Sequence, residues 1–143
     1  MPQRNQHYLF VYGSLRRGEP NEIAGLAREA VFISRAFVRG RLYDLGHCPC
    51  VALDPLASWI TGELYMLASD SLEGIDRLER EVDFHRSQAL VHDAAGGAWP
   101  CWIYLPPSPP MHRHSIIPGG DWVRYRKIRE RRQAESTAVR VAA

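Results

Sequence analysis

The sequence predicts an α+β protein, built as a small mixed β-barrel or strongly curved sheet with flanking α-helices. Two long strand-like runs each contain an internal glycine, Gly40 within residues 31–45 and Gly62 within residues 59–67, and such glycines often mark a bulge or bend. Strands and helices do not alternate regularly, which argues against a doubly wound sheet. The 143 residues are enough for one domain with its own core.

The first strand is expected over residues 8–12, where YLFVY has the aromatic and branched composition of a buried strand. Gly13 and Ser14 then end it. A glycine permits unusual backbone angles and close approach of a ligand, so the N–H groups of Ser14 and Leu15 could form a cradle for a small anion or a carbonyl oxygen. An ordinary strand-to-loop turn has the same pattern.

A short helix is expected over residues 20–30, beginning beside this turn. Its N-terminus would add a positive partial charge near a bound anion, although Asn21 and Glu22 fit plain helix capping equally well. Residues 31–45 alternate partly between apolar and polar and indicate a half-buried strand. Residues 49–55 are expected to be a connecting segment.

Residues 59–67 predict a second long strand, and residues 69–82 predict the one strongly amphipathic helix. Asp70 and Glu73 resemble a capping box at the start of that helix. Two strands over residues 86–93 and 98–105 follow, joined by a hairpin turn. Prolines then start a stiff loop: Pro106, Pro107, Pro109 and Pro110.

Glu79 falls on the apolar side of the predicted helix. On a helical wheel the apolar arc contains Leu72, Ile75, Leu78 and Val82. A charged, unpaired glutamate facing a core costs several kcal/mol, so Glu79 needs a partner, a proton or a wet cavity. A helix that ends before Val82 would instead expose Glu79, and a salt bridge to Arg86 would neutralise it.

Residues 10–22, FVYGSLRRGEPNE, resemble the opening signature of the gamma-glutamylcyclotransferase-like family, in which F-x-Y-G-[ST]-L is followed by a glycine and an asparagine and forms the substrate loop. The resemblance covers roughly residues 7–125. Further matches occur in the family's order at Gly40–Tyr43, Gly62–Tyr65, Ile75–Glu79 and Gly120–Trp122.

The resemblance implies a six-stranded mixed barrel with its pocket at one mouth. It also implies intramolecular aminolysis of a gamma-glutamyl amide, which releases 5-oxoproline and an amine or amino acid without a cofactor or metal. Glu79, at the position of the glutamate in the family's L-D-x-x-E, would be the general acid/base. The substrate-binding residues would be Tyr12, Gly13, Ser14, Leu15 and Tyr104.

The chain departs from the family pattern at two places. Phe84 stands where the family commonly has a tyrosine two residues before an arginine, and His85 is a weak candidate to replace the lost hydroxyl. Cys48-Pro49 stands where a Tyr-Pro pair is typical. The missing phenol favours an alternative function, a non-catalytic small-molecule-binding or regulatory member of the same fold.

The charge is unevenly distributed. Residues 124–143 carry seven Lys or Arg against Glu130 and Glu135, so the rest of the chain has a net charge of about −3. This pattern argues against a nucleic-acid-binding domain. It predicts a domain over residues 1–125 and a basic C-terminal helix or tail over residues 126–143, which would suit an acidic carrier. Cleavage of a gamma-glutamyl group from a carrier-bound intermediate is a second activity that fits the family.

Three cysteines, an odd number, and the lack of an N-terminal apolar segment predict a protein of the reducing cytoplasm. Cys48 and Cys50 are one residue apart, which is a poor match to zinc spacing, and Cys101 stands alone. We expect structural or inert thiols. No apolar run reaches the roughly 20 residues needed to cross a bilayer, so no membrane span is expected.

Overall fold

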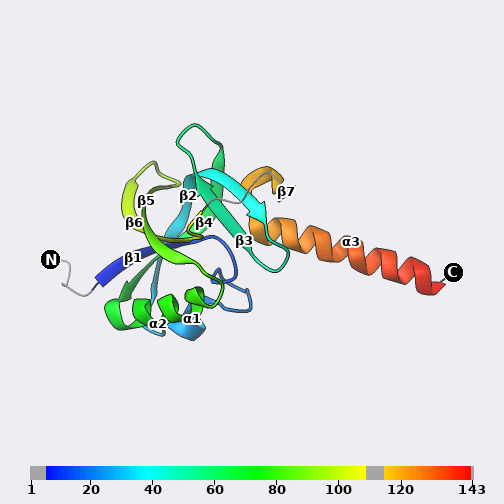
Figure 1. Ribbon diagram of the computed structural model, residues 1–143, viewed down its shortest axis with the longest axis horizontal. Coiled ribbons are helices and arrows are strands. Elements are labelled where there is room, and N and C mark those ends of the chain that lie inside the picture. The colour runs from blue at the N-terminus through cyan, green and yellow to red at the C-terminus, as the bar shows by residue number, and fades with distance from the viewer. Residues whose placement is uncertain (1–5, 109–114, 143) are drawn as a thin grey trace.

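A computed structural model describes residues 6–108 and 115–142 of the chain. Figure 1 shows the arrangement of its strands and helices. The strands are β1 (Gln6–Val11), β2 (Val31–Asp44), β3 (Pro49–Leu53), β4 (Trp59–Ala68), β5 (His85–Asp93), β6 (Ala98–Leu105) and β7 (Ser115–Ile116). The helices are α1 (Ile23–Leu26), α2 (Ser69–Arg80), the 3-10 turn η1 (Pro118–Gly120) and α3 (Trp122–Ala142).

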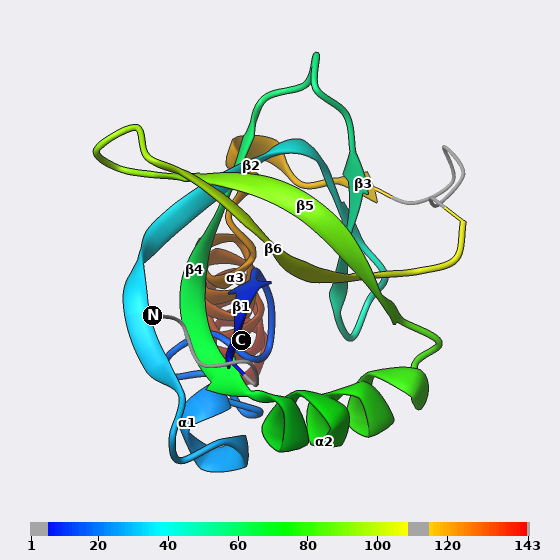
Figure 2. The same cartoon turned by 90° about the vertical axis from the view of Figure 1, so that its left-hand side faces the viewer.

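Five of the strands close into a barrel in the order β2-β4-β1-β6-β5, with β5 pairing back to β2. The pairs are antiparallel except β1 with β6, so the barrel is mixed. β3 and β7 pair with β2 outside this ring. Figure 2 shows the ring, with α1 and α2 together on one side of it. The predicted α+β barrel is confirmed, with five strands in the closed ring and two more, β3 and β7, paired with β2 beside it.

The two glycines that predicted curvature lie at close backbone contacts. A Cβ at Gly62 would sit 2.3 Å from the carbonyl oxygen of Val11, so β4 can pass β1 here only with glycine. At Gly40, β2 exchanges its pairing partner from β4 to β3. The register shift in β2 lies between Phe32 and Ser34, so the bulge expected at Gly40 occurs earlier in the strand.

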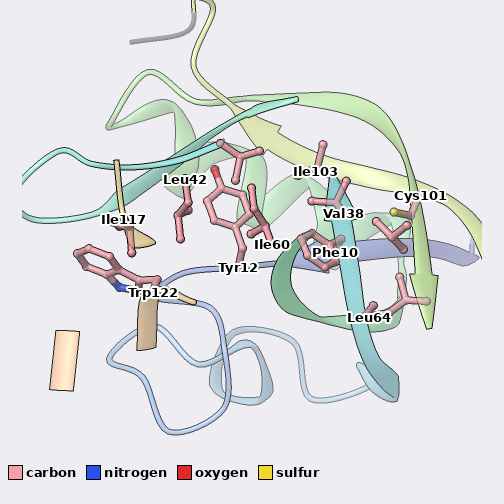
Figure 3. Close-up of a cluster of buried hydrophobic side chains, with 13 residues drawn as sticks. Phe10, Tyr12, Val38, Leu42, Ile60, Leu64, Cys101, Ile103, Ile117 and Trp122 are labelled. Atoms are coloured by element: carbon pink, nitrogen blue, oxygen red, sulfur yellow. The ribbon is translucent and has the colours of Figure 1, made fainter. Parts of the chain in front are cut away.

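Buried side chains form two clusters on the two sides of β1, because successive residues of a strand point to opposite faces. Phe10 and Tyr12 belong to the cluster inside the barrel, which Figure 3 shows together with Ile60, Ile103 and Trp122. Leu9 and Val11 belong to the second cluster, which packs β1 against α2. Its members from and after α2 are Leu72, Ile75 and Phe84. This second cluster places α2 beside the end of β1.

Several local expectations were wrong. The helix predicted over residues 20–30 is a single turn, because the N–H of Ile23 bonds back to the loop carbonyl of Leu15 and Ala27 is already extended. Residues 49–53, predicted to be a connection, form β3, since the chain turns back to pair with β2. The cap of α2 is Ala68 and no side chain caps it, so the Asp70 capping box does not form.

α3 begins in the core and ends in solvent. Trp122 is only 3% exposed and packs in the barrel cluster, whereas the residues from 130 to 141 are all exposed. Figure 1 shows the helix projecting away from the barrel. The predicted boundary between residues 125 and 126 therefore falls inside one continuous helix.

Two further expectations concern the proline-rich loop and membrane-spanning segments. Pro106 and Pro107 follow the end of β6, while Pro109 and Pro110 lie outside the described residues. Among the helices of the described residues, none combines the length and the apolar character that a membrane span requires.

Candidate functional site

A cavity of about 320 Å³ lies where the end of β1, the start of β3 and the end of α2 meet. All six site residues predicted from the sequence line it: Tyr12, Gly13, Ser14, Leu15, Glu79 and Tyr104. The other lining residues are Phe10, Val11, Pro20, Asn21, His47, Cys48, Pro49, Leu78, Glu81, Val82 and Phe84. The fold thus brings the first loop and the end of α2 to one hollow, although more than 60 residues separate them.

The loop after β1 lines one wall of this cavity with Gly13, Ser14 and Leu15. Gly13 packs closely on Pro49 of β3, since a Cβ added to Gly13 would lie 2.9 Å from the Pro49 Cγ. The carbonyl of Gly13 accepts the N–H of Arg16, and that of Ser14 accepts the N–H of Asn21. Among the described residues, the N–H groups of Ser14 and Leu15 have no hydrogen-bond partner, so both remain available for a ligand.

Glu79 lies in the penultimate position of α2 and is half-buried in the cavity wall. Its backbone carbonyl accepts the N–H groups of Val82 and Phe84, at 3.1 and 3.0 Å, and so holds the end of the helix. Its carboxylate makes no ion pair with any described residue. Burial raises the pKa of Glu79 to about 7, because desolvation disfavours the charged form.

Arg86, the partner that the sequence offered to Glu79, binds a different carboxylate. Its Nε lies 2.8 Å from Asp76 Oδ1, and its guanidinium stacks over Trp102. The salt bridge considered for Glu79 therefore forms at Asp76. The helix does end before Val82, as the other alternative required, but Glu79 still faces the cavity.

The two tyrosines of the cavity direct their hydroxyl groups to protein acceptors. Tyr12 donates to the carbonyl oxygen of Tyr104 at 2.7 Å. Tyr104 donates to Asp76 Oδ1 at 2.8 Å. Burial and the neighbouring carboxylate raise the pKa of Tyr104 well above its usual value. Both phenols are therefore neutral walls of the cavity.

Cys48 also lines the cavity, and Cys50 lies buried next to it in β3. Burial raises the pKa of Cys50 to about 12. Burial and, as a smaller cause, the nearby charge of Glu79 raise the pKa of Cys48. A thiol with a raised pKa is a poor nucleophile at neutral pH. Among the described residues, no group of three His, Cys, Asp or Glu side chains is placed to hold a metal ion.

Phe84 is buried and forms part of the cavity wall directly after α2. The side chain that replaces the expected tyrosine therefore faces the same hollow as Glu79. His85, by contrast, is exposed, pairs with Asp83 and does not line the cavity.

Sequence reasoning missed a set of buried charges behind the loop. Glu63 lies in β4 of the barrel and is only 8% exposed although its side chain is charged. It accepts Arg16 Nε at 3.0 Å and the Tyr65 hydroxyl at 2.8 Å. The sequence contained an indication of this pair, because Glu63 interrupts the mainly apolar run of β4 and a buried glutamate needs a partner.

The basic helix lies apart from this cavity. The N-terminal half of α3 borders a separate open groove of about 800 Å³. Among the residues that line this groove are Arg35, Arg124, Arg129 and Arg132. Arg129 is paired with Asp44 at 2.9 Å. Binding of an acidic partner along α3 stays a prediction.

The cavity thus combines a carboxyl group that titrates near neutrality with two backbone donors. In the part of the chain that the structure describes, no lysine or arginine lines it. Such a set can move one proton between two atoms of a small ligand and can hold an anion or a carbonyl oxygen by hydrogen bonds.

Known proteins resemble the chain over the same region. The family described as "Gamma-glutamyl cyclotransferase, AIG2-like" matches residues 9–124. A Vibrio cholerae protein called "Putative gamma-glutamylcyclotransferase" is 32% identical over 118 residues, which cover 82% of this chain and 96% of that protein. "Gamma-L-glutamyl-butirosin B gamma-glutamyl cyclotransferase" of Niallia circulans is 32% identical over 129 residues, covering 82% of this chain and 76% of that protein.

Solved structures share the fold. YkqA from Bacillus subtilis superposes with a TM-score of 0.72 at 25% identity over 87% of this chain, and the matched part is 42% of the YkqA chain. An AIG2-like protein from mouse gives a TM-score of 0.64 at 24% identity and covers 83% of this chain and 95% of its own. The match over most of the barrel shows that the chain belongs to the gamma-glutamyl cyclotransferase, AIG2-like family.

Proposed function

We propose that the protein is a gamma-glutamyl cyclotransferase that converts a gamma-glutamyl amide into 5-oxoproline and a free amine. One observation carries the proposal: Glu79, with no ion-pair partner among the described residues and a pKa of about 7, shares one cavity with the free N–H groups of Ser14 and Leu15. The family supports the reaction type, and the name of the Niallia circulans relative supports a gamma-glutamyl substrate.

In this reaction the alpha-amine of the substrate attacks its own gamma-carbonyl carbon. A five-membered ring forms, and the bond to the departing nitrogen breaks. Glu79 accepts the proton that the attacking nitrogen loses and returns it to the departing nitrogen. A pKa near 7 suits both steps, because the carboxylate and the carboxylic acid are both populated at neutral pH.

The loop would supply the anion site. The N–H groups of Ser14 and Leu15 would hold either the alpha-carboxylate of the substrate or the oxyanion that develops on the gamma-carbonyl oxygen. The cavity walls formed by Tyr12, Phe84 and Tyr104 would fold the substrate so that amine and carbonyl meet. No water enters the reaction, so a partly dry cavity favours it.

The charge of the cavity favours an amine over an amino acid as the leaving group. Glu79 and Glu81 line the cavity, and none of the described residues that line it is a lysine or arginine. A departing amino acid would bring its carboxylate close to these acidic groups, whereas an amine brings none. Like charges at short range disfavour binding.

The test is incubation of the purified protein with matched gamma-glutamyl amines and gamma-glutamyl amino acids, with 5-oxoproline measured by mass spectrometry. We expect 5-oxoproline from the gamma-glutamyl compounds, fastest from the amines, and none from the corresponding alpha-glutamyl compounds. Absence of 5-oxoproline from the whole panel would overturn the proposal.

Phe84 supports one other function, that of a non-catalytic member that binds gamma-glutamyl compounds. A binding protein would show a calorimetric signal with these ligands but no product. Phe84→Tyr restores a hydroxyl to the cavity wall, so product formation by this variant alone would identify the phenylalanine as the cause of the lost turnover.

A further inference from the structure

The cavity loop is anchored by three of its residues that do not line the cavity. Arg16, Arg17 and Glu19 follow directly after the segment with the free N–H groups, and each is bonded to another element of the fold. Arg16 and Glu19 are buried although both are charged. A buried charge without a partner is costly, so these contacts restrict where the loop can lie.

The first anchor is Glu63 of β4. One of its carboxylate oxygens accepts Arg16 Nε at 3.0 Å, and the other accepts the backbone N–H of Arg17 at 3.0 Å. Arg16 continues to Asp121, whose Oδ1 lies 2.8 Å from Arg16 Nη1. Asp121 immediately precedes α3, so this chain of contacts joins the barrel, the loop and the start of the helix.

The second anchor comes from α3 itself. Arg126 Nε donates to Glu19 Oε1 at 2.9 Å, and Arg126 Nη2 contacts the second oxygen of the same carboxylate. The pair is thus bidentate, and the Glu19 side chain is almost completely buried beneath it. Bidentate arginine–carboxylate pairs fix orientation as well as distance.

Backbone bonds connect the anchored residues to the cavity. The N–H of Glu19 donates to the Arg16 carbonyl, and the N–H of Arg16 donates to the Gly13 carbonyl. Movement at Glu19 therefore displaces the turn that carries Ser14 and Leu15.

We propose that Arg126 is a positioning residue: through Glu19 it makes the first turns of α3 hold the cavity loop in its ligand-binding shape. The inference rests on the proposed function for its catalytic consequence, and on the contacts alone for the anchoring. It also extends the folded unit beyond residue 125, because the loop depends on a residue of the helix.

The test is Arg126→Gln, which removes the charge and the bidentate pair. Arg131→Gln is the matched control, because Arg131 is an exposed residue of the same helix with no ion pair to any described residue. We expect amide hydrogen exchange over residues 13–21 to become roughly tenfold faster in Arg126→Gln, with exchange in the barrel strands unchanged. Arg131→Gln should match the wild type.

Kinetics give the second measurement. For a gamma-glutamyl amine that the wild type turns over, Arg126→Gln should raise KM by roughly tenfold while changing kcat less, since the loop binds and Glu79 does the proton transfer. The double variant Glu19→Gln/Arg126→Gln no longer buries an unpaired charge. It should recover part of the lost exchange protection, which a double-mutant cycle measures.

The outcomes separate the two proposals. Unchanged loop exchange in Arg126→Gln overturns the anchoring. Faster loop exchange in Arg126→Gln, together with no 5-oxoproline from the wild type, supports the anchoring and overturns the proposed function. Faster loop exchange with unchanged KM in an active enzyme overturns the positioning role of Arg126.

Discussion

The hydroxyl group of Tyr104 donates a hydrogen bond to the carboxylate of Asp76 across 2.8 Å. The same carboxylate also pairs with Arg86. Glu79, three residues later on α2, receives neither partner. Because Asp76 uses the arginine and the phenol, Glu79 keeps the raised pKa that burial produces. Of these two acids of one helix, Asp76 is therefore paired with other side chains, whereas Glu79 is left to the cavity.

Replacing Glu79 with glutamine should abolish turnover while preserving the fold. Glutamine keeps the size of the side chain but cannot carry the proton, and general acid–base groups contribute about 10² to 10⁴ in rate. We therefore expect 5-oxoproline release to fall at least roughly 100-fold, with binding of 5-oxoproline by calorimetry little changed. Glu73→Gln, an exposed change on the same helix, serves as the control. Wild-type turnover in Glu79→Gln would show that another group moves the proton.

Activity should depend on pH through the ionisation of Glu79. The carboxylate form accepts the proton, so kcat/KM should rise with pH and level off above an apparent pKa of about 7. The alpha-ammonium group of the substrate also titrates, at higher pH. A ligand whose amine is blocked is therefore needed to separate the ionisation of Glu79 from that of the substrate. His47 and Glu81 also line the cavity, so the difference in this ligand's pH-dependent binding between the wild type and Glu79→Gln reports Glu79. If the pH profile of kcat/KM instead rose near pH 4.5, the Glu79 carboxyl group would be hydrated and its pKa would not be raised.

The stability of the protein should depend on pH at the same group, in the opposite sense to its activity. The folded pKa of Glu79 is about 7 and the unfolded value is 4.5, so the folded state binds the extra proton between these values. Glu79 therefore leaves the free energy of unfolding unchanged below pH 4.5. Above pH 7 it lowers this free energy most, by roughly 3 kcal/mol. Urea unfolding of Glu79→Gln should show a gain of up to that size at pH 8 and almost none at pH 4.5. Equal gains at both pH values would contradict burial as the cause.

Gly13 should tolerate no side chain without loss of binding. A Cβ there would lie 2.9 Å from the Pro49 Cγ, so Gly13→Val must move either the loop or β3, and both line the cavity. We expect the affinity for 5-oxoproline, measured by calorimetry, to fall by roughly tenfold or more, a cost typical of overpacking. Gly25→Ala is the control, since a Cβ at Gly25 meets nothing within 4 Å. Unchanged affinity in Gly13→Val would place the ligand away from this turn.

Much of the fold was predictable because local patterns carried it. The strand before Gly13, the long strands with internal Gly40 and Gly62, and the amphipathic helix predicted over residues 69–82 all follow from side-chain periodicity and backbone freedom. The errors occurred where tertiary pairing overrode local signals. β3 forms because β2 offers it a partner, and the cap of α2 is set by the preceding strand β4, although the sequence offered Asp70.

By itself the sequence placed Glu79 on the apolar side of a helical wheel and a glycine turn after the first strand, since both depend only on the order of residues. Closure of the barrel decided the rest. It brought Glu79 and the turn to one cavity, assigned Arg86 to Asp76, and joined Glu19 to Arg126 across the molecule. Which charges meet is a matter of distance in space, and residues 107 positions apart become neighbours only after the chain has folded.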